Sequence, residues 1–322
     1  EPDENSIQLF VEDVGVTDAT FDVHFNGVNK PRSFFLKRNG TEILTITNAP
    51  NDTLVIDEQL QPKQSYTYKA STVIEGQTIS TKELQITTMD TTSHNFTWHI
   101  DTLGDGASSV LNDVAIVNEN DVWAVGEIEV HDSSGGWRNP PYNIAHWNGV
   151  QWELRTLKFK FDFGENYATA EAIFAFDSNN IVVSSGGCVM KWNGQVWTNL
   201  DYLYHGENGI GNVYTIWGTS SNDFYGGGLN GSIVHWDGSH WQKIESGTTL
   251  DIQDIYGATN PRTGELEILA VASKHLVNAD KKIFLIQNST IRNVSYIPIP
   301  YSIHSIWFKP RRKYFVVGSG MY

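Results

Sequence analysis

The sequence predicts an all-β protein in which a small antiparallel β-sandwich is followed by a β-propeller of four-stranded blades. Two observations lead to this prediction. A hairpin motif with two tryptophans recurs after residue 92 at a spacing of about 45 residues, which is the length of one propeller blade. The residues before it alternate between apolar and polar side chains in short runs bounded by turn residues. We therefore place the sandwich at residues 1–92 and the propeller at residues 93–322.

The first domain contains alternating runs that are typical of a two-layer antiparallel structure. These runs lie at residues 20–25, 33–37 and 53–56, and turn signals such as Asn39-Gly40 separate them. The run from Leu84 to Thr88 is expected to be the last strand, and the polar residues after it form a linker.

A corner motif in this domain connects it to a known family. Leu60, Gln61 and Pro62 form a Leu-x-Pro turn, and Tyr66 follows at the start of an alternating run. The segment resembles the fibronectin type III signature, in which a tyrosine hydroxyl bonds back to the corner between two strands. The resemblance implies that Tyr66 is the corner tyrosine and that the domain is a spacer or an adhesive module.

Each repeat of the second domain is expected to contribute four strands. An apolar first strand and a second strand are joined by a turn rich in Asn and Asp, as in residues 113–116 and 122–126. The third strand ends in one tryptophan and the fourth begins with another. The Asn-Gly or Asp-Gly between them supplies the positive φ angles of a tight hairpin. The repeat tryptophans are Trp147, Trp152, Trp192, Trp197, Trp236 and Trp241, and we expect the second one of each hairpin to be more than half buried.

Five copies of the pattern are present, and the last two are altered. In the fourth copy Ile286 and Ile291 replace the two tryptophans, and the fifth copy has only two strands before Tyr322. We therefore expect a propeller that is incomplete within this sequence. Trp98 resembles a fourth-strand tryptophan without the preceding strands. It is expected to lie in a strand that closes the propeller by completing a blade, which removes an exposed edge.

The repeat as a whole resembles a broad group of propellers. Its second strand reads Asn-Asp-Val-Trp-Ala-Val-Gly at residues 120–126, and its hairpin reads His-Trp-Asn-Gly-x-x-Trp at residues 146–152. This pattern resembles bacterial secreted and lipoprotein propellers, and more distantly the Asp-box repeats of sialidases and the propellers that assist photosystem assembly. The resemblance implies an exported protein. It transfers no catalytic residue, because Asp-box-like turns are structural.

The composition of the chain disfavours some classes of binding partner. A formal net charge of −15 over 322 residues disfavours nucleic acid and anionic membranes, and no apolar run is long enough for a transmembrane helix. The chain begins at Glu1 without Met, so we expect that a leader was removed and that the protein is extracellular, periplasmic or on the cell surface, with a lipid anchor as one option. The single cysteine, Cys188, excludes an internal disulfide and is expected to be a small buried apolar residue.

Loop lengths suggest where a ligand binds. The second-to-third and fourth-to-first joins are long, and in a propeller both classes lie on one face. They carry aromatic and basic side chains, which are the expected ligand-binding residues: Trp137, Arg138, Tyr142, Tyr202, Tyr204 and His205. The alternative is that these aromatics pack the loops onto the rim.

Glycosidase catalysis and metal binding are less favoured than ligand binding by the aromatic loops. The carboxylates Asp162, Glu165, Asp201 and Glu207 lie on the same loops and allow a glycosidase-like pair, although no catalytic residue is assigned. His146 and His235 recur at one repeat position and are expected to be structural rather than metal ligands. No cofactor or metal is expected, with a structural calcium at residues 101–106 as the exception considered.

These observations favour a non-catalytic binding or adhesion protein that recognises a glycan or a protein on the long-loop face. Two alternatives remain open: a carbohydrate-active enzyme that uses carboxylates on the same face, and a structural subunit that self-associates in a surface assembly.

Overall fold

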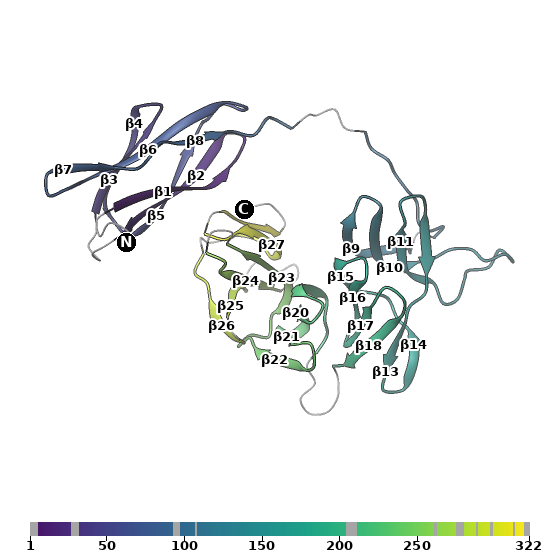
Figure 1. Cartoon of the computed structure of the whole chain (residues 1–322). Helices are drawn as coiled ribbons and strands as arrows, with labels where there is room; N and C mark the ends of the chain where they lie inside the picture. The colour runs from purple at the N-terminus through teal and green to yellow at the C-terminus, as the bar shows by residue number, and fades with distance from the viewer. Residues whose placement is uncertain are drawn as a thin grey trace. The chain divides into compact units, whose positions relative to one another are not determined.

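A computed structural model describes residues 6–26, 32–92, 97–106, 108–203, 211–260, 263–274, 280–287, 289–296, 299–311 and 313–318. The chain divides into two compact units, Glu1–His99 and Ile100–Tyr322. In these described ranges all of the regular structure is β-strand except for one short 3-10 turn, Leu229–Gly231, so the predicted all-β class is confirmed (Figure 1). Among the described residues no helix is long and apolar enough to cross a membrane.

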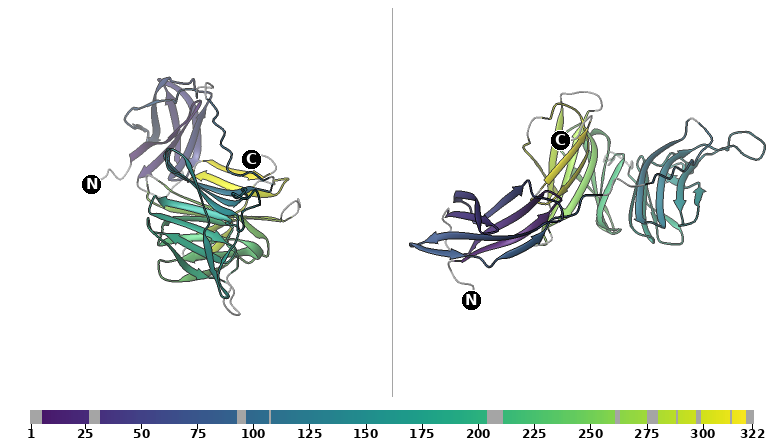
Figure 2. Two further views of the ribbon diagram at one scale, coloured as in Figure 1. Left: turned by 90° about the vertical axis from the view of Figure 1, so that its right-hand side faces the viewer. Right: turned by 90° about the horizontal axis from the view of Figure 1, so that it is seen from above.

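The first unit contains two antiparallel sheets, which are seen from two further sides in Figure 2. One sheet has the strand order β1-β2-β5, and the other has the order β4-β3-β6-β7 with β8 also paired to β6. The strands are β1 (Ser6–Val14), β2 (Asp18–Asn26), β3 (Arg32–Arg38), β4 (Thr41–Ala49), β5 (Asp52–Glu58), β6 (Ser65–Ile74), β7 (Gln77–Ser80) and β8 (Leu84–Thr87).

The core of this unit lies between the two sheets. Phe21 of β2 and Tyr68 of β6 are fully buried, and their ring centroids are 4.3 Å apart. The Tyr66 hydroxyl accepts a hydrogen bond from the backbone N–H of Gln61 at 2.8 Å, so the predicted corner contact is present. Asn39, with φ of 49°, and Gly40, with φ of 80°, form the predicted tight turn between β3 and β4.

In the described residues the second unit contains five antiparallel repeat sheets that follow one another along the chain, and a separate two-stranded sheet lies between the first and the second of them. Sheets 1 to 4 have four strands each, in sequence order from one edge to the other, and sheet 5 has two strands. Sheet 1 comprises β9 (Val110–Asn118), β10 (Asp121–Ile128), β11 (Tyr142–Trp147) and β12 (Trp152–Arg155), and sheet 2 comprises β15 (Ala172–Asp177), β16 (Asn180–Ser185), β17 (Cys188–Trp192) and β18 (Trp197–Tyr202). Sheet 3 comprises β19 (Thr215–Ser220), β20 (Asp223–Gly227), β21 (Ser232–Trp236) and β22 (Trp241–Glu245), and sheet 4 comprises β23 (Asp251–Thr259), β24 (Leu266–Ser273), β25 (Lys281–Gln287) and β26 (Thr290–Asn293). Sheet 5 comprises β27 (Ile303–Lys309) and β28 (Lys313–Gly318).

The first strands of successive sheets contact one another, from β9 through β15, β19 and β23 to β27. Carboxylates bridge two of these contacts. An Asp113 oxygen accepts the backbone N–H of Ile173 at 2.9 Å, and an Asp254 oxygen accepts the backbone N–H of Ile306 at 3.0 Å. Burial raises the pKa of Asp113, and the negative charge of Asp254 adds to this effect although the two residues lie in sheets 1 and 4.

The tryptophan hairpins form as predicted, but their turns differ in detail. Trp147 pairs with Trp152, Trp192 with Trp197 and Trp236 with Trp241. Only the glycine of each turn has positive φ, for example 87° at Gly149. The prediction that the preceding Asn or Asp shares this conformation was wrong.

The preceding residue instead binds the loop through its side chain. The side-chain oxygen Oδ1 of Asn148 accepts hydrogen bonds from the backbone N–H groups of Val150 and Gln151, both at 3.0 Å. Asn193 and Asp237 make the equivalent contacts in the next two hairpins. Each of the three hairpin turns is therefore held by one glycine and one side-chain acceptor.

The burial of the repeat tryptophans follows the prediction. Trp236 is buried, and Trp147, Trp152, Trp192, Trp197 and Trp241 are each more than half buried. In sheet 4 the isoleucine pair Ile286 and Ile291 occupies the same register position. Ser289, with φ of 64°, takes a positive-φ position in that turn.

Trp98 does not lie in a strand in this structure, so its expected role in closing a blade stays a prediction. Residues 97–100 form no strand, and the Trp98 side chain is 82% exposed. Within the described residues sheet 5 has only the pair β27 and β28, so the blade that Trp98 was expected to complete is not among them.

The long join expected at residues 157–169 contains a further hairpin. β13 (Lys158–Phe161) pairs with β14 (Gly164–Tyr167). Phe159 is fully buried in the core between sheets 1 and 2. The alternation of Lys and Phe in β13 explains this difference, because it gives the segment one apolar face.

Candidate functional site

The long joins of sheets 1 and 2 meet at one rim of the second unit. The Tyr167 hydroxyl and the Thr169 hydroxyl both donate to the Glu127 carboxylate, at 3.0 and 2.9 Å. The Asn143 amide donates to the backbone carbonyls of Leu157 and Ala168, both at 2.8 Å. The second-to-third join of sheet 1 and the fourth-to-first join that follows it therefore lie on the same rim.

The segment between β10 and β11 projects away from sheet 1 at this rim (Figure 1, Figure 2). Its tip is a tight loop built around Asp132. The Asp132 carboxylate accepts the backbone N–H of Ser134 at 2.8 Å and that of Gly136 at 3.1 Å. Hydrogen bonds from Ser134 are the main cause of the lowered pKa of Asp132. The carboxylate thus fixes the loop in its ionised form.

This loop presents an exposed aromatic pair. His131 and Trp137 form an isolated bridge across the loop, and their rings stack with centroids 3.9 Å apart. The Trp137 side chain is 52% exposed. A Cβ atom added at Gly106 would lie 3.2 Å from the Trp137 ring, so the indole packs closely over that glycine. The ring is therefore fixed in place while about half of it faces solvent.

Carboxylates surround the base of the pair. The Asp105 carboxylate accepts the backbone N–H of His131 at 2.9 Å and lies 3.6 Å from the His131 ring nitrogen. The Asp105 backbone N–H donates to the Glu129 carbonyl at 2.8 Å. We name His131, Trp137 and Asp105 the rim aromatic site. Carboxylate oxygens beside an aromatic face can accept hydrogen bonds from a ligand that stacks on the ring.

Two other predicted ligand residues lie on the same segment. The Arg138 guanidinium lies 3.9 Å from the centre of the Tyr142 ring and donates to the Pro140 carbonyl. Arg138 is thus held against the loop by a cation–π contact. The alternative prediction was that the loop aromatics pack onto the rim. Tyr142 fits this alternative better than Trp137 does, since Tyr142 is the less exposed of the two.

The remaining predicted ligand residues are not tested by the structure. The backbone of Tyr202 ends β18, and its side chain lies outside the described part of the chain. Tyr204 and His205 also lie outside the described residues. Of the carboxylates considered for a glycosidase pair, Glu207 and the Asp201 side chain are likewise outside them. Glu165 lies in β14 opposite Lys160, and Asp162 is close enough to Cys188 to affect its pKa.

Cys188 is a buried core residue. Its side chain is fully buried among the residues between sheets 1 and 2, and its Sγ lies 3.3 Å from the Lys160 carbonyl. Burial, with a contribution from the Asp162 charge, raises the pKa of the thiol to about 12. The thiolate is the reactive form of cysteine, so this thiol is inert at neutral pH.

The two recurring histidines occupy one structural position. His146 Nε2 lies 2.9 Å from an Asp121 oxygen, and the ring stacks on Trp123 at 3.9 Å. His235 repeats this arrangement with Asp223 at 2.7 Å and Tyr225 at 4.3 Å. The aspartate begins the second strand of its sheet, and the aromatic residue follows two positions later. Each histidine therefore joins the second and third strands of one sheet.

The segment considered for calcium makes internal contacts instead. An Asp101 oxygen accepts the Trp152 indole N–H at 3.1 Å, and Asp105 contacts His131. Within the described ranges no group of three or more His, Cys, Asp or Glu side chains is arranged to hold a metal ion.

Sequence reasoning missed two sets of residues. His131 and Asp105 complete the rim aromatic site, but they were not proposed because their proximity depends on the folding of the loop over residues 104–106. Asp113 and Asp254 bridge successive sheets, and their signal in the sequence is an acidic residue directly before the apolar residues of a first strand.

No family model matches the chain, and no curated protein matches it. Among solved structures, the central fibronectin-III array of RIM-binding protein matches with 10% sequence identity and a TM-score of 0.20, over 93% of this chain and 99% of that chain. A TM-score this low does not establish a shared arrangement of strands.

Proposed function

We propose that the first unit is a fibronectin type III-like sandwich and that the second unit consists of blades of a β-propeller. The corner hydrogen bond of Tyr66 and the two-sheet strand order support the first assignment. Consecutive four-stranded meanders with touching first strands support the second, because radial repetition of such sheets is the propeller arrangement. The Coulombic effect of Asp254 on Asp113 adds to this support, since first strands line the centre of a propeller.

The function that the geometry supports best is non-catalytic recognition of a glycan at the rim aromatic site. The observation that carries this proposal is the Trp137 ring, which is stacked on His131, fixed by its loop and 52% exposed. Exposed aromatic rings that are held rigidly contribute strongly to binding, because little conformational entropy is lost when the ligand binds. The flat apolar ring fits the C–H face of a sugar, and the Asp105 carboxylate fits its hydroxyl groups.

The charge of the protein favours a neutral ligand. With a formal net charge of −15, the chain repels anionic glycans at long range. The acceptors near Trp137 are also carboxylates, so a ligand with hydroxyl or amide donors suits the site better than one with sulfate or carboxylate groups. We therefore propose a neutral carbohydrate outside the cell as the ligand, and the resemblance of the repeat to secreted propellers supports this location.

Glycan-array binding followed by titration calorimetry tests this proposal. We expect the full chain to bind neutral glycans, and Trp137→Ala to weaken the best binding by about tenfold or more, as loss of an interface aromatic does. The matched control is Trp98→Ala, which removes another exposed tryptophan outside the site and should leave binding unchanged. Equal binding by the Trp137→Ala variant and the unchanged chain would contradict the proposal. Hydrolysis of the bound glycan would favour the enzyme alternative.

A further inference from the structure

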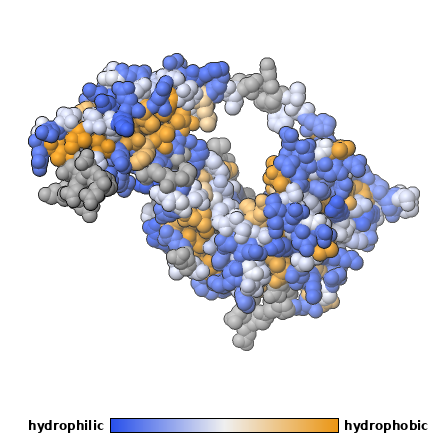
Figure 3. Space-filling model, in the orientation of Figure 1, coloured by the Kyte–Doolittle hydropathy of each residue, from blue (hydrophilic) through white to orange (hydrophobic). Residues whose placement is uncertain are grey.

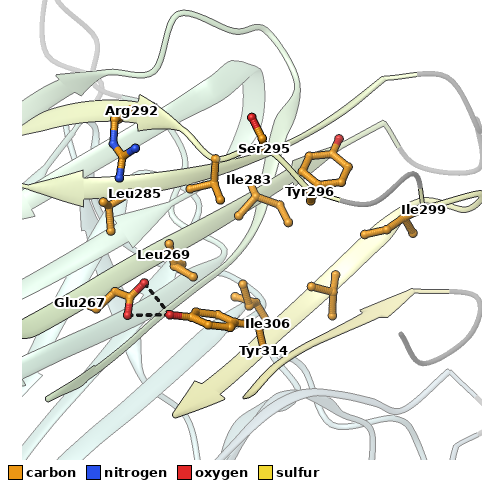
Figure 4. Close-up of a pocket in the computed structure, with 12 residues that line it drawn as sticks. Glu267, Leu269, Ile283, Leu285, Arg292, Ser295, Tyr296, Ile299, Ile306 and Tyr314 are labelled. Carbon is orange, nitrogen blue, oxygen red and sulfur yellow. Dashed lines mark hydrogen bonds between the residues drawn. The ribbon is translucent and has the colours of Figure 1, made fainter. Parts of the chain in front are cut away.

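Two clefts between successive sheets of the second unit differ in chemistry. The larger one, a groove of about 620 Å³ beside sheets 4 and 5, is lined mainly by apolar side chains such as Leu269, Leu285 and Ile306 (Figure 4). Apolar surface is visible over this part of the second unit in Figure 3. The smaller one, of about 330 Å³, lies between sheets 1 and 2 and is lined by polar and aromatic side chains. Both of its walls belong to four-stranded sheets, so it can be compared with the next interface along the chain.

The smaller cleft, which we name the polar cleft, is lined by strands of sheet 1 and turns of sheet 2. Trp123, His146 and Arg155 lie in β10, β11 and β12. Ser178, in the turn between β15 and β16, and Gly194, in the turn between β17 and β18, line the opposite wall. The polar cleft lies where β10 begins, whereas the rim aromatic site follows the end of β10. The two sites are therefore separate.

A lysine fills the equivalent position at the interface between sheets 2 and 3. Lys191 and His146 each precede the tryptophan that ends the third strand of their sheet. The Lys191 ammonium group donates to the Ser221 carbonyl and to the side-chain oxygen of Asn222, both at 3.0 Å. Both acceptors lie in the first turn of sheet 3, so an ammonium group joins sheets 2 and 3 at this point.

The turns that face these two interfaces have corresponding contacts. The Ser221 hydroxyl donates to the side-chain oxygen of Asn180 at 2.9 Å, and a hydrogen bond from the Ser178 side chain helps to lower the pKa of Asp121. Asn180 and Asp121 each begin the second strand of the preceding sheet. The residue after each serine is an asparagine. The turn of sheet 2 therefore carries the same kinds of acceptor that bind Lys191 in the turn of sheet 3.

The polar cleft has more negative charge around it than its counterpart has. Asp121 stands where sheet 2 has Asn180, and Glu153 stands where it has Thr198. Burial favours the neutral form of Asp121, but the hydrogen bonds to its carboxylate outweigh this effect and lower its pKa. The hydrogen bond from Arg155 is the main cause of the lowered pKa of Glu153. Two ionised carboxylates thus lie near one guanidinium, which favours a cationic ligand.

We propose that the polar cleft binds the alkylammonium side chain of a lysine from a partner protein, in the way that Lys191 binds between sheets 2 and 3. The ammonium group donates to the turn of sheet 2, and the two carboxylates balance its charge. Trp192 lines the cleft and packs against the methylene groups, because the stem of a lysine can lie on an apolar surface while its charged end is solvated. The formal net charge of −15 attracts a cationic partner at long range.

An NMR titration with Nα-acetyl-lysine amide tests the proposal on the full chain. The Trp123 indole N–H donates to Asp121 at 2.7 Å, so its signal should shift as the probe binds. The matched control is Nα-acetyl-norleucine amide, which has the alkyl chain without the ammonium group and should cause no shift. Equal shifts with the two probes would overturn the proposal, and so would tighter binding of glucosamine than of the lysine probe. Trp137→Ala should leave the binding intact, which separates this site from the rim aromatic site.

Substitutions copied from sheet 2 complete the test. His146→Lys should fill the polar cleft from within the chain and abolish binding of the lysine probe. Glu153→Thr changes a residue at the surface and should weaken binding by about threefold or more, and it decides the matter if His146→Lys does not fold. The matched control is Glu245→Thr, because Glu245 pairs with Lys243 at 2.9 Å on the fourth strand of sheet 3, outside the cleft. Unchanged binding in His146→Lys or in Glu153→Thr, or an equal loss in Glu245→Thr, would contradict the proposal.

Discussion

Two interfaces of the second unit, between sheets 2 and 3 and between sheets 4 and 5, are built from the same elements except for one strand. In both, the first strands touch and apolar side chains of the second strands meet the neighbouring sheet. The first of them also receives Val234 and Trp236 from β21, whereas the second has a groove at that place. The difference shows that the third strand, rather than contact between the first strands, completes the apolar packing between successive sheets.

The largest effect is expected at the filled interface. Trp236→Ala should lower the free energy of unfolding by about 3–5 kcal/mol, as loss of large buried aromatic residues does. The reason is that Trp236 is buried and lies in the core shared by sheets 2 and 3. Urea unfolding followed by circular dichroism measures this change. A loss below about 1 kcal/mol would show that the third strand contributes little to the packing.

A smaller loss is expected at the open interface. Leu285→Ala should cost about 2 kcal/mol, at the lower end of the range for buried leucines, because one side of Leu285 faces the groove and the cavity can open to water. The same unfolding experiment measures it. A loss as large as that of Trp236→Ala would mean that the groove is filled in solution and would remove the distinction between the two interfaces.

The Asp254 carboxylate adds hydrogen bonds to the contact between sheets 4 and 5. Besides the Ile306 N–H, it accepts the Ser305 hydroxyl at 2.6 Å and the Thr215 hydroxyl at 3.2 Å, so it links sheets 3, 4 and 5. Asp254→Ala should cost about 1–3 kcal/mol, because it leaves a backbone donor without its acceptor. Asp254→Asn keeps one acceptor oxygen and should cost less. Equal losses in the two variants would show that the hydrogen bond to Ile306 is not the source of the effect.

The smallest expected effect is on the pH dependence of the free energy of unfolding. The pKa of Asp113 is raised in the folded chain, so the folded state binds its proton more tightly than the unfolded state does. Its contribution to stability therefore falls as the pH rises from about 4 through the raised pKa and is constant above it. Asp113→Asn should flatten this part of the stability profile. Unfolding titrations between acid and neutral pH measure the slope, and an unchanged slope in the variant would contradict the assignment.

Sequence reasoning was strongest where the signal is local. The paired tryptophans, the glycine turns and the Tyr66 corner each depend on a few neighbouring residues, and all of them were found at the predicted positions. The β13–β14 hairpin was missed although its Lys and Phe residues alternate, because the segment was interpreted as a loop between repeats. The rim aromatic site was predicted in part, since Trp137 was identified by its position in a long join and its partner His131 was not.

Features that depend on contacts between distant residues could not be predicted. The role of Trp98 was inferred from its likeness to other repeat tryptophans, and it stays a prediction because it depends on strands that are not among the described residues. The two strands of the fifth copy were predicted, but the groove beside them was not. It arises because sheet 4 is two strands wider than the sheet that covers it.

Amide hydrogen exchange of the unliganded chain tests most directly whether the third strand is what the open interface lacks. The amides of β28 that face away from β27 should exchange much faster than the equivalent amides of β20 and β24, which are paired to third strands. The pairing of β28 with β27 should protect the other half of its amides. If all amides of β28 were as well protected as those of β20 and β24, the edge would already be paired in solution and the comparison would be wrong.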